Sequence, residues 1–218
     1  MIRNICAAGH EIGSHSDNHQ LVYRLTPHQF EQDLLNSIKS LEDVTGARVR
    51  AYRSPGFSIT RESLWAWSIL AENGIEFDSS IFASRHSQGG LRDFRASGPI
   101  QIDLGGGITL KQFPVLPGRL CGCSIGFSGG GYFRLLPYSI VQLLMTRADC
   151  AMTYFHPRDF DPNQPLVRNL PLHRVFKSYI GLRSSRRKLK QLLQEFELVD
   201  LATADSMTDW TAQPRMRV

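Results

Sequence analysis

The sequence lacks a cysteine framework and a long apolar run. Its 218 residues include only four scattered cysteines, which argues against a disulfide scaffold and predicts reduced thiols. Cys121 and Cys123 form one C-x-C pair, but the sequence has no second pair to complete a thiolate metal site. Every apolar run falls well short of the ~20 residues that a membrane span needs. We therefore expect no spanning segment.

The first 13 residues also lack the basic start and apolar stretch of a secretory signal, so we expect the chain in the cytoplasm. A net charge of +5 and a pI near 9.2 would suit nucleic acid only if the basic residues clustered on one surface. The one cluster, at 183–190, runs into leucines at helical spacing. We favour the solvated first turns of an amphipathic helix over an interaction patch, and expect no nucleic-acid partner.

The size and composition are those of a single globular domain. Hydrophobic residues make up 42% of the chain and charged residues 21%, which argues against extensive disorder. We expect one domain over 1–218, with a partly flexible tail at 203–218.

Helical and strand patterns alternate along the chain. The clearest helix starts at Thr26, where Gln29 completes a capping box and Pro27 fits the first turn, and Gly46 ends it. We expect the other helices at 2–8, 60–73, 135–147, 184–196 and 203–210, and strands at 11–15, 49–53, 75–78, 108–115 and 151–156. The glycines and proline within 84–105 predict a long surface excursion. The glycine run at 129–131 predicts a mobile turn. The alternation predicts an α/β fold, a parallel sheet or barrel covered by helices.

Four polar residues stand where predicted strands end. His15, Arg53, Asp78 and His156 each close a different strand, the place where a barrel of this class carries its chemistry. The remaining histidines, His10, His28, His86 and His173, receive no site role.

His15 and His19 form an H-x-x-x-H pair. On a helical turn, residues four apart share one face, so both imidazoles could reach one ion at about 2.0–2.1 Å, the usual zinc–nitrogen distance. Ordinary alternatives stay open for each residue: a chance surface pair here, a surface ion pair for Arg53, a turn cap for Asp78, and a loop histidine for His156.

These positions resemble the motifs of the polysaccharide deacetylases, carbohydrate esterase family 4. "GHEIGSHSDNH" is similar to the family's histidine motif in its H-[ST]-x-x-H form. "RSP" from Arg53 resembles the arginine motif, "FDSSIF" around Asp78 the third acidic motif, and "YFHP" around His156 the late histidine motif. "GGGYFRLLPY" and "YFHPRDFDPNQP" resemble the bacterial subgroup associated with exopolysaccharide loci.

The resemblance implies a distorted (β/α) barrel and a metal-dependent N-deacetylase acting on N-acetylated amino sugars of a polysaccharide or oligosaccharide. It implies a divalent metal, most often zinc, with His15 and His19 as ligands. His156 would protonate the leaving amine, Arg53 would orient the base carboxylate, and Asp78 would pair with His156 and favour its protonated form.

The chain departs from the family at its start. The family's Asp pair, one a metal ligand and the other the general base, should precede the histidine motif, yet the only acid before His15 is Glu11, inside a predicted strand. Asp17 is two positions from each histidine and is a poor third ligand. Asp159 and Asp161 could approach from a loop but match no family motif.

The simplest expectation is that Met1 is an internal start, or that the sequence is a fragment whose barrel lacks its N-terminal strand. Strand edges left unpaired would favour pairing with another chain, so a homo-oligomer is one expectation. Two alternatives stay open: an inactive relative that binds glycan or metal, and a metal-independent scaffold protein of an export complex.

Overall fold

The computed structural model describes residues 1–218 except 85–87, 92–93, 168 and 170. Contacts within the chain separate two compact units, unit 1 (Met1–Pro114 with Val199–Val218) and unit 2 (Val115–Leu198). His86 lies outside the described residues, and so does the side chain of His173.

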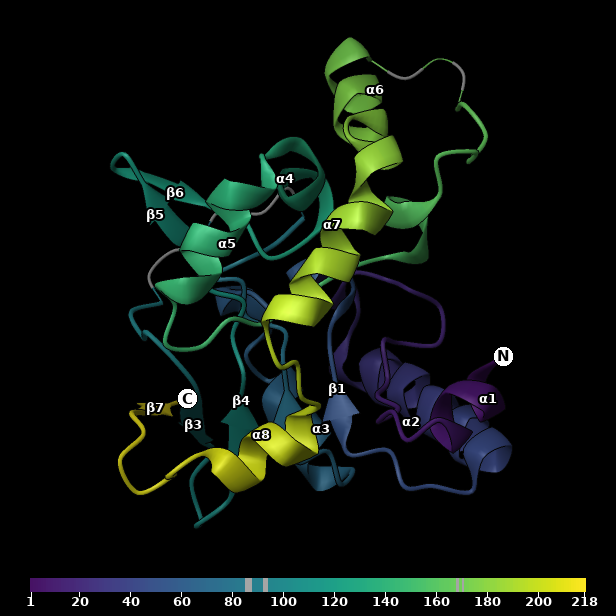
Figure 1. The fold of residues 1–218 in the computed structure, drawn as a ribbon. Coiled ribbons are helices and arrows are strands. Elements are labelled where there is room, and N and C mark those ends of the chain that lie inside the picture. Colours follow the sequence, from purple (N-terminus) through teal and green to yellow (C-terminus); the bar gives the residue numbers. More distant parts are fainter. Residues whose placement is uncertain (85–87, 92–93, 168, 170) are drawn as a thin grey trace. The chain divides into compact units, whose positions relative to one another are not determined.

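Unit 1 contains an open five-stranded sheet in the order β1-β2-β4-β3-β7 (Figure 1). Neighbouring strands run parallel from β1 through β2 to β4 and between β3 and β7, whereas β3 and β4 are antiparallel. The bounds are β1 Ala51–Tyr52, β2 Phe77–Asp78, β3 Ile100–Asp103, β4 Thr109–Gln112 and β7 Arg215–Arg217. The predicted α/β class is confirmed in this unit.

The helices of unit 1 pack with the sheet around one apolar core. They are α1 Ile2–Ala7, η1 Val22–Arg24, α2 Pro27–Thr45, η2 Pro55–Phe57, η3 Arg61–Ser63, α3 Ala66–Glu72 and α8 Leu201–Met207. The capping box of Thr26 and Gln29 starts α2, and Gly46, at φ 68°, ends it as predicted. Phe30 and Leu34 of α2 are buried in the same core as Trp67 and Ile102.

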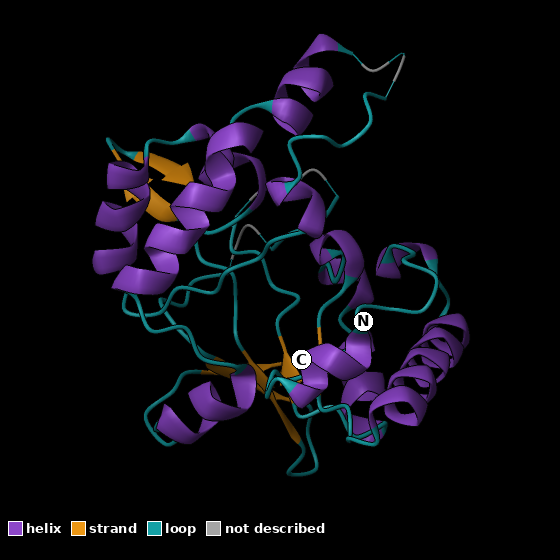
Figure 2. Ribbon diagram, turned by 45° about the vertical axis from the view of Figure 1, so that its right-hand side comes forward, coloured by secondary structure: helices purple, strands orange, loops and turns teal. Residues whose placement is uncertain are grey.

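Unit 2 is mostly helical, with one β-hairpin that Figure 2 shows as a separate pair of orange strands. The bounds are β5 Gly118–Leu120, β6 Cys123–Ile125, α4 Gly130–Leu135, α5 Tyr138–Thr146, η4 Pro157–Phe160, α6 Leu172–Tyr179 and α7 Leu182–Glu195. Phe127, Phe133, Val141 and Leu144 form its core with Leu192 of α7.

Four local predictions are wrong. The surface excursion expected at 84–105 ends in β3, a strand of the main sheet in which Ile100 and Ile102 are buried. The segment 151–156 is not a buried strand, because only Tyr154 makes a β-bridge, to Gly129, and the residues around it are half-buried. The turn expected at 129–131 is instead the start of α4. The strand expected at 11–15 is reduced to one bridge between Ser14 and Tyr52.

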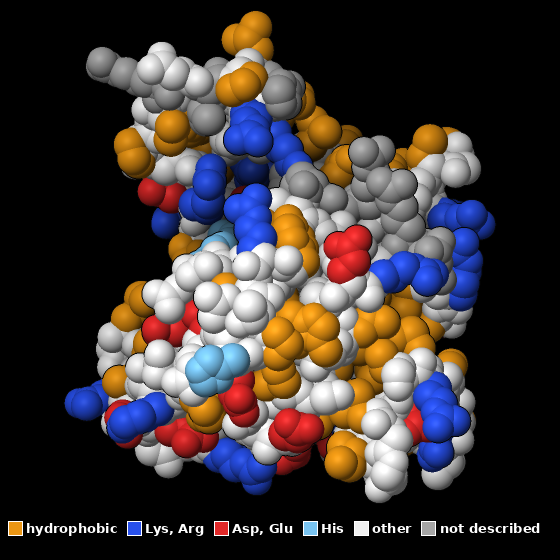
Figure 3. All heavy atoms as spheres, turned by 180° about the vertical axis from the view of Figure 1, so that it is seen from behind, with side chains coloured by type: hydrophobic (Ala, Val, Ile, Leu, Met, Phe, Trp, Pro, Cys, Tyr) orange, Lys and Arg blue, Asp and Glu red, His pale blue; other side chains and the backbone are white. Residues whose placement is uncertain are grey.

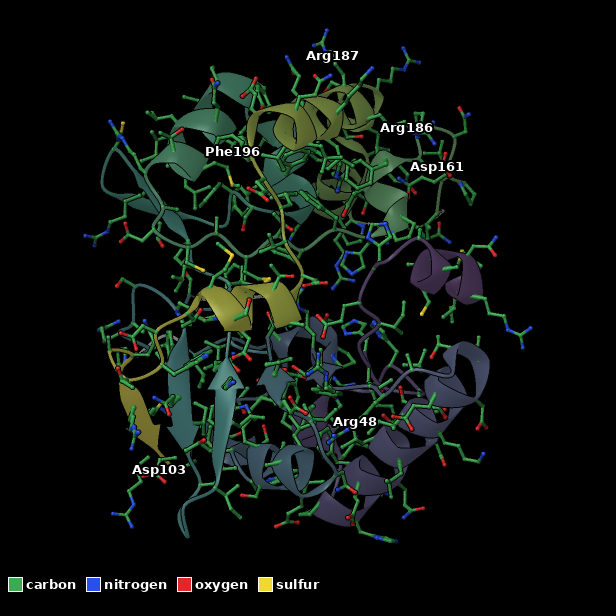
Figure 4. All side chains as sticks on the ribbon, turned by 60° about the horizontal axis from the view of Figure 1, so that its bottom comes forward. Arg48, Asp103, Asp161, Arg186, Arg187 and Phe196 are labelled. Atoms are coloured by element: carbon green, nitrogen blue, oxygen red, sulfur yellow. The ribbon has the colours of Figure 1, made fainter. Side chains whose placement is uncertain are left out.

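The basic cluster at 183–190 is solvated only in part. Arg187 points away from α7 into solvent (Figure 4), as expected. Lys188 is instead buried, and its Nζ donates to three backbone carbonyls at the C-terminal end of α4, those of Phe133 (3.3 Å), Arg134 (2.7 Å) and Leu136 (2.6 Å). Burial lowers the pKa of the Lys188 ammonium. This lysine therefore caps α4.

On the face shown in Figure 3, Lys and Arg side chains lie in several separate groups. The expected absence of a nucleic-acid partner stays a prediction. Within the described part of the chain, no helix combines the length and apolarity needed to cross a bilayer.

Candidate functional site

The predicted site residues of unit 1 meet at the carboxyl ends of adjacent parallel segments. Ser14 pairs with Tyr52, and Tyr52 pairs with Asp78, so these three residues form one row across the sheet. His15 and Arg53 follow in the next row. Successive side chains of a strand point to opposite faces, so Asp78 shares the buried side with Tyr52, and Arg53 takes the other side.

His15 is oriented by the strand beside it. Its Nδ1 lies 2.6 Å from the carbonyl oxygen of Arg53, and a carbonyl can only accept, so Nδ1 donates. In the neutral imidazole this tautomer leaves the lone pair on Nε2. A backbone carbonyl on the other ring nitrogen is the usual way in which proteins orient a metal-binding histidine.

His19 is brought to His15 by a loop and not by the expected helical turn. Ser16 and His19 have positive φ values of 72° and 54°, which a helix does not allow. The two rings nevertheless meet edge to face, with centroids 5.1 Å apart and planes at 77°.

Asp33 of α2 holds this loop. Its carboxylate accepts from the backbone N–H groups of Asp17 (3.0 Å) and Asn18 (2.9 Å) and from the Asn18 side-chain amide (3.1 Å). Burial alone would raise the pKa of Asp33, but hydrogen bonding from the loop, residues 16–18, outweighs it and the pKa is lowered. The residues between the two histidines are thus anchored to an ionised, buried carboxylate.

The histidine pair fits two positions of a zinc site. Two imidazoles on a tetrahedral zinc at about 2.1 Å have ring centroids roughly 5 Å apart, and the observed 5.1 Å matches that spacing. Among the residues that the structure describes, no His, Cys, Asp or Glu joins the pair in a group of three that could hold a metal ion. The fit is therefore to two ligands.

Asp78 is fully buried, and its side chain is surrounded by donors. Trp67 Nε1 donates to Oδ2 at 3.0 Å, the side-chain amide of Gln112 donates to the same oxygen at 2.6 Å, and the Ser80 hydroxyl donates to Oδ1. Burial raises the pKa of Asp78 to about 6, while the bonds from Ser80 and Trp67 and the charge of Arg53 oppose the rise. Its pairing with His156 stays a prediction.

Arg53 binds the strand next to its own. Its Nε donates to the carbonyl of Ser79 at 3.2 Å, and its terminal nitrogen donates to the Ser79 hydroxyl at 2.8 Å. The guanidinium also lies 6.0 Å above the ring of Phe57. Its predicted role in orienting a base carboxylate stays a prediction.

His156 belongs to unit 2, at the start of η4. Its side chain is 58% exposed, and its Nδ1 lies 3.7 Å from Oδ2 of Asp159. The same oxygen accepts the backbone N–H of His156 at 3.0 Å. Burial would raise the pKa of Asp159, but hydrogen bonds from His156 and the charge of Arg134 lower it.

Sequence reasoning missed Asp33, and it considered Asp159 only as an acid that could approach the metal site, not as a partner of the His156 backbone. Asp33 lies among the buried positions of α2 with Phe30, Leu34 and Ser37, so an acid on the apolar stripe was the available signal. Asp159 has capping-box spacing from His156, which was also visible. Glu11 serves α8, because it accepts the backbone N–H groups of Leu201 and Ala202.

Two family models match the chain. Residues 79–205 match the family described as a domain of unknown function, DUF3473, and residues 1–77 match the polysaccharide deacetylase family. The peptidoglycan deacetylase of Helicobacter pylori is 31% identical over 83 residues, which cover 37% of this chain and 26% of that protein. The match thus spans about a quarter of that curated relative.

Solved structures share the fold. A protein assigned as a polysaccharide deacetylase from Mycobacterium smegmatis superimposes with a TM-score of 0.62 at 17% identity, covering 99% of this chain and 68% of that one. A second, from Pseudomonas aeruginosa PAO1, gives 0.50 at 16% identity, with 97% and 59% covered. The predicted fold of polysaccharide deacetylase barrel type is confirmed, with a sheet that is open over the described residues.

Proposed function

The chain belongs to the DUF3473 family and its first 77 residues are of polysaccharide deacetylase type, and from this we propose that it is a metal-dependent hydrolase that removes acetyl groups from N-acetylated amino sugars. The proposed substrate is a polysaccharide or oligosaccharide, and the proposed setting is exopolysaccharide biosynthesis. The observation that supports this most directly is the His15–His19 pair, whose 5.1 Å ring spacing suits two imidazoles on one divalent ion.

His15 and His19 would hold the metal, zinc foremost. When bound, such an ion polarises a carbonyl and lowers the pKa of a water. The chain's own part is to fix the two rings: the Arg53 carbonyl sets the His15 tautomer, and Asp33 holds the loop that carries His19. Two imidazoles are one fewer than the usual three protein ligands of a catalytic zinc ion, so we expect the 218-residue chain to bind zinc weakly.

His156 would serve as the proton donor. Hydrolysis of an acetamide adds water to the carbonyl carbon and breaks the C–N bond, and the departing amine must take up a proton. An imidazole suits this step because it titrates near neutrality in its ordinary state. The exposed His156 ring would give its proton to the amine nitrogen.

The test is acetate release from N-acetylglucosamine oligomers by the full product of the gene, with zinc added. His15→Ala, His19→Ala and His156→Ala should each lose activity. His28→Ala is the matched control, because His28 is an exposed histidine in the first turn of α2. A wild-type protein that releases no acetate under these conditions would rule out the proposed activity.

One observation favours a second function. Since the described residues supply only two ligands of a three-ligand site, an inactive relative that binds glycan or metal is the alternative. Saturable binding of the same oligomers with no acetate release, at any zinc concentration, would support the binding protein over the enzyme.

A further inference from the structure

A buried carboxylate lies beneath the exposed imidazole of His156. Asp159 is 4% exposed, and its Oδ2 accepts the His156 backbone N–H while facing Nδ1 of the same residue at 3.7 Å. The same oxygen thus binds the backbone of this histidine and faces its ring. The 3.7 Å separation is longer than a hydrogen bond, so the contact is electrostatic as it stands.

Arg134 holds the carboxylate from the other side. Its Nε lies 3.2 Å from Oδ1 of Asp159, and both side chains are almost fully buried. The other guanidinium nitrogens donate to backbone carbonyls at the end of α6, those of Lys177 (2.9 Å), Ser178 (2.8 Å) and Ile180 (3.1 Å). The guanidinium is therefore held by four partner atoms, one on Asp159 and three on the backbone.

A third tie fixes the turn itself. Arg186 of α7 donates from Nε to the carbonyl of Phe160, the last residue of η4, at 3.0 Å. Figure 4 shows Arg186 beside the segment that carries Asp161. The turn that follows His156 is thus held to α6 through Arg134 and to α7 through Arg186.

A capping role alone leaves part of this arrangement unexplained. The bond from the His156 backbone N–H to Asp159 is one half of a capping box at the start of η4, and that box brings the carboxylate near the histidine. A capping box does not require an arginine buried behind the carboxylate. A carboxylate at Nδ1 favours the tautomer that carries its proton there and sets the orientation of the ring.

We propose that Asp159 is the positioning residue of His156, that Arg134 positions Asp159, and that supporting this histidine is a role of the DUF3473 region. The proposal rests on the proposed function, in which His156 gives a proton to the amine. Asp78 is not needed for this role, because its oxygens already accept from Trp67, Ser80 and Gln112.

The first measurement needs no variant and no activity. The ¹⁵N chemical shifts of the His156 ring, recorded above neutral pH in the full chain with labelled histidine, report which nitrogen carries the proton. We expect the proton on Nδ1. A ring protonated mainly on Nε2 would overturn the proposal, whether or not the protein releases acetate.

The second measurement compares Asp159→Asn with Asp161→Asn. Asp161 is an exposed acid two residues further along, whose Oδ1 accepts the backbone N–H of Asn163 at 2.9 Å. Asp159→Asn should shift the His156 tautomer and lower kcat for acetate release about tenfold or more, with KM nearly unchanged. Asp161→Asn should leave the tautomer as in the wild type.

Equal tautomer populations in Asp159→Asn and the wild type would overturn the proposal, and so would an equal shift in Asp161→Asn. If Asp159→Asn does not fold, the wild-type ring shifts still decide. If the wild type releases no acetate, the proposed function fails, and the ring shifts separately show whether Asp159 positions His156.

Discussion

The buried carboxyl of Asp78 makes the stability of unit 1 depend on pH in a direction opposite to that of most acids. Its pKa in the fold is about 6, against an ordinary 3.8. The folded state therefore keeps the Asp78 proton over a pH range in which the unfolded chain releases it. The stabilising contribution of Asp78 is greatest below its ordinary pKa and is lost as the pH rises through about 6.

The loss has a definite size. A carboxyl with a pKa near 6 in the fold and 3.8 in the unfolded chain loses about 3 kcal/mol in all as the pH rises from well below 3.8 to above 6, of which about 2 kcal/mol falls between about pH 4.5 and pH 7. Asp78→Asn removes this titration. The asparagine amide would face the amide nitrogen of Gln112, which adds a cost of about 1–3 kcal/mol that does not change with pH.

The assay is urea unfolding followed by tryptophan fluorescence at several pH values from about 4.5 to 7. Trp65, Trp67 and Trp210, the three tryptophans of the chain, all lie in unit 1, so the signal reports that unit. The free energy of unfolding of the wild type should fall relative to that of Asp78→Asn by about 2 kcal/mol over this pH range.

Asp33→Asn is the matched control. Asp33 is also a buried acid of unit 1, but its pKa is lowered by the loop amides it binds. Its contribution is present above the ordinary pKa of 3.8 and is lost only as the pH falls below it. The gap between wild type and Asp33→Asn should stay flat from about pH 5 to 7. A flat gap for Asp78→Asn as well would refute the reasoning.

Unit 2 offers two further predictions, both read by circular dichroism on heating. Lys188→Met leaves three α4 carbonyls without their donor and should cost about 2–4 kcal/mol, whereas Lys190→Met, at an exposed position of the same helix, should cost almost nothing. Gly129→Ala would drive a Cβ into the backbone oxygen of Tyr154 and should destabilise by about 2 kcal/mol or more, whereas Gly98→Ala in unit 1, with open space around it, should be neutral. Zinc titration of the printed chain by calorimetry should show weak binding, and tight one-to-one binding would reveal a third ligand within it.

Helix and strand ends that are determined by residues near them in the sequence were predictable. The start and end of α2 depend on Thr26, Gln29 and Gly46, all of them within or next to the helix. The end of β1 at Tyr52, next to Arg53, and the end of β2 at Asp78 also followed from local pattern, since short apolar runs are bounded there by polar residues.

Elements that depend on distant partners were not predictable. Residues 151–156 are as apolar as a buried strand, but only Tyr154 finds a strand-like partner, at Gly129. Lys188 was expected in water because its neighbours are basic, yet its position on α7 faces the end of α4, 52 residues or more away in sequence. Local pattern cannot show which exposed-looking residue meets a helix end.

The alternation of side chains along a strand could have shown which side of the sheet each polar residue faces, but it was not applied to the sequence. Arg53 and Asp78 were placed together because both end strands, but the pairing of Tyr52 with Asp78 puts Arg53 one row further on. Alternation then sends Asp78 into the buried side and leaves Arg53 beside His15. Position within the row, and not only nearness to a strand end, decides which side chains can act together.

Each of the two histidine segments is held by a buried carboxylate that binds its backbone. Asp33 binds the backbone of the loop between His15 and His19, and Asp159 binds the backbone of His156. Each acid is buried and each has a lowered pKa, so both are ionised at neutral pH. Both anchors contribute above the ordinary carboxyl pKa and are lost as the pH falls through the lower folded value. Acid should therefore release both histidine segments before it disturbs Asp78, because Asp78 is held best when it is protonated.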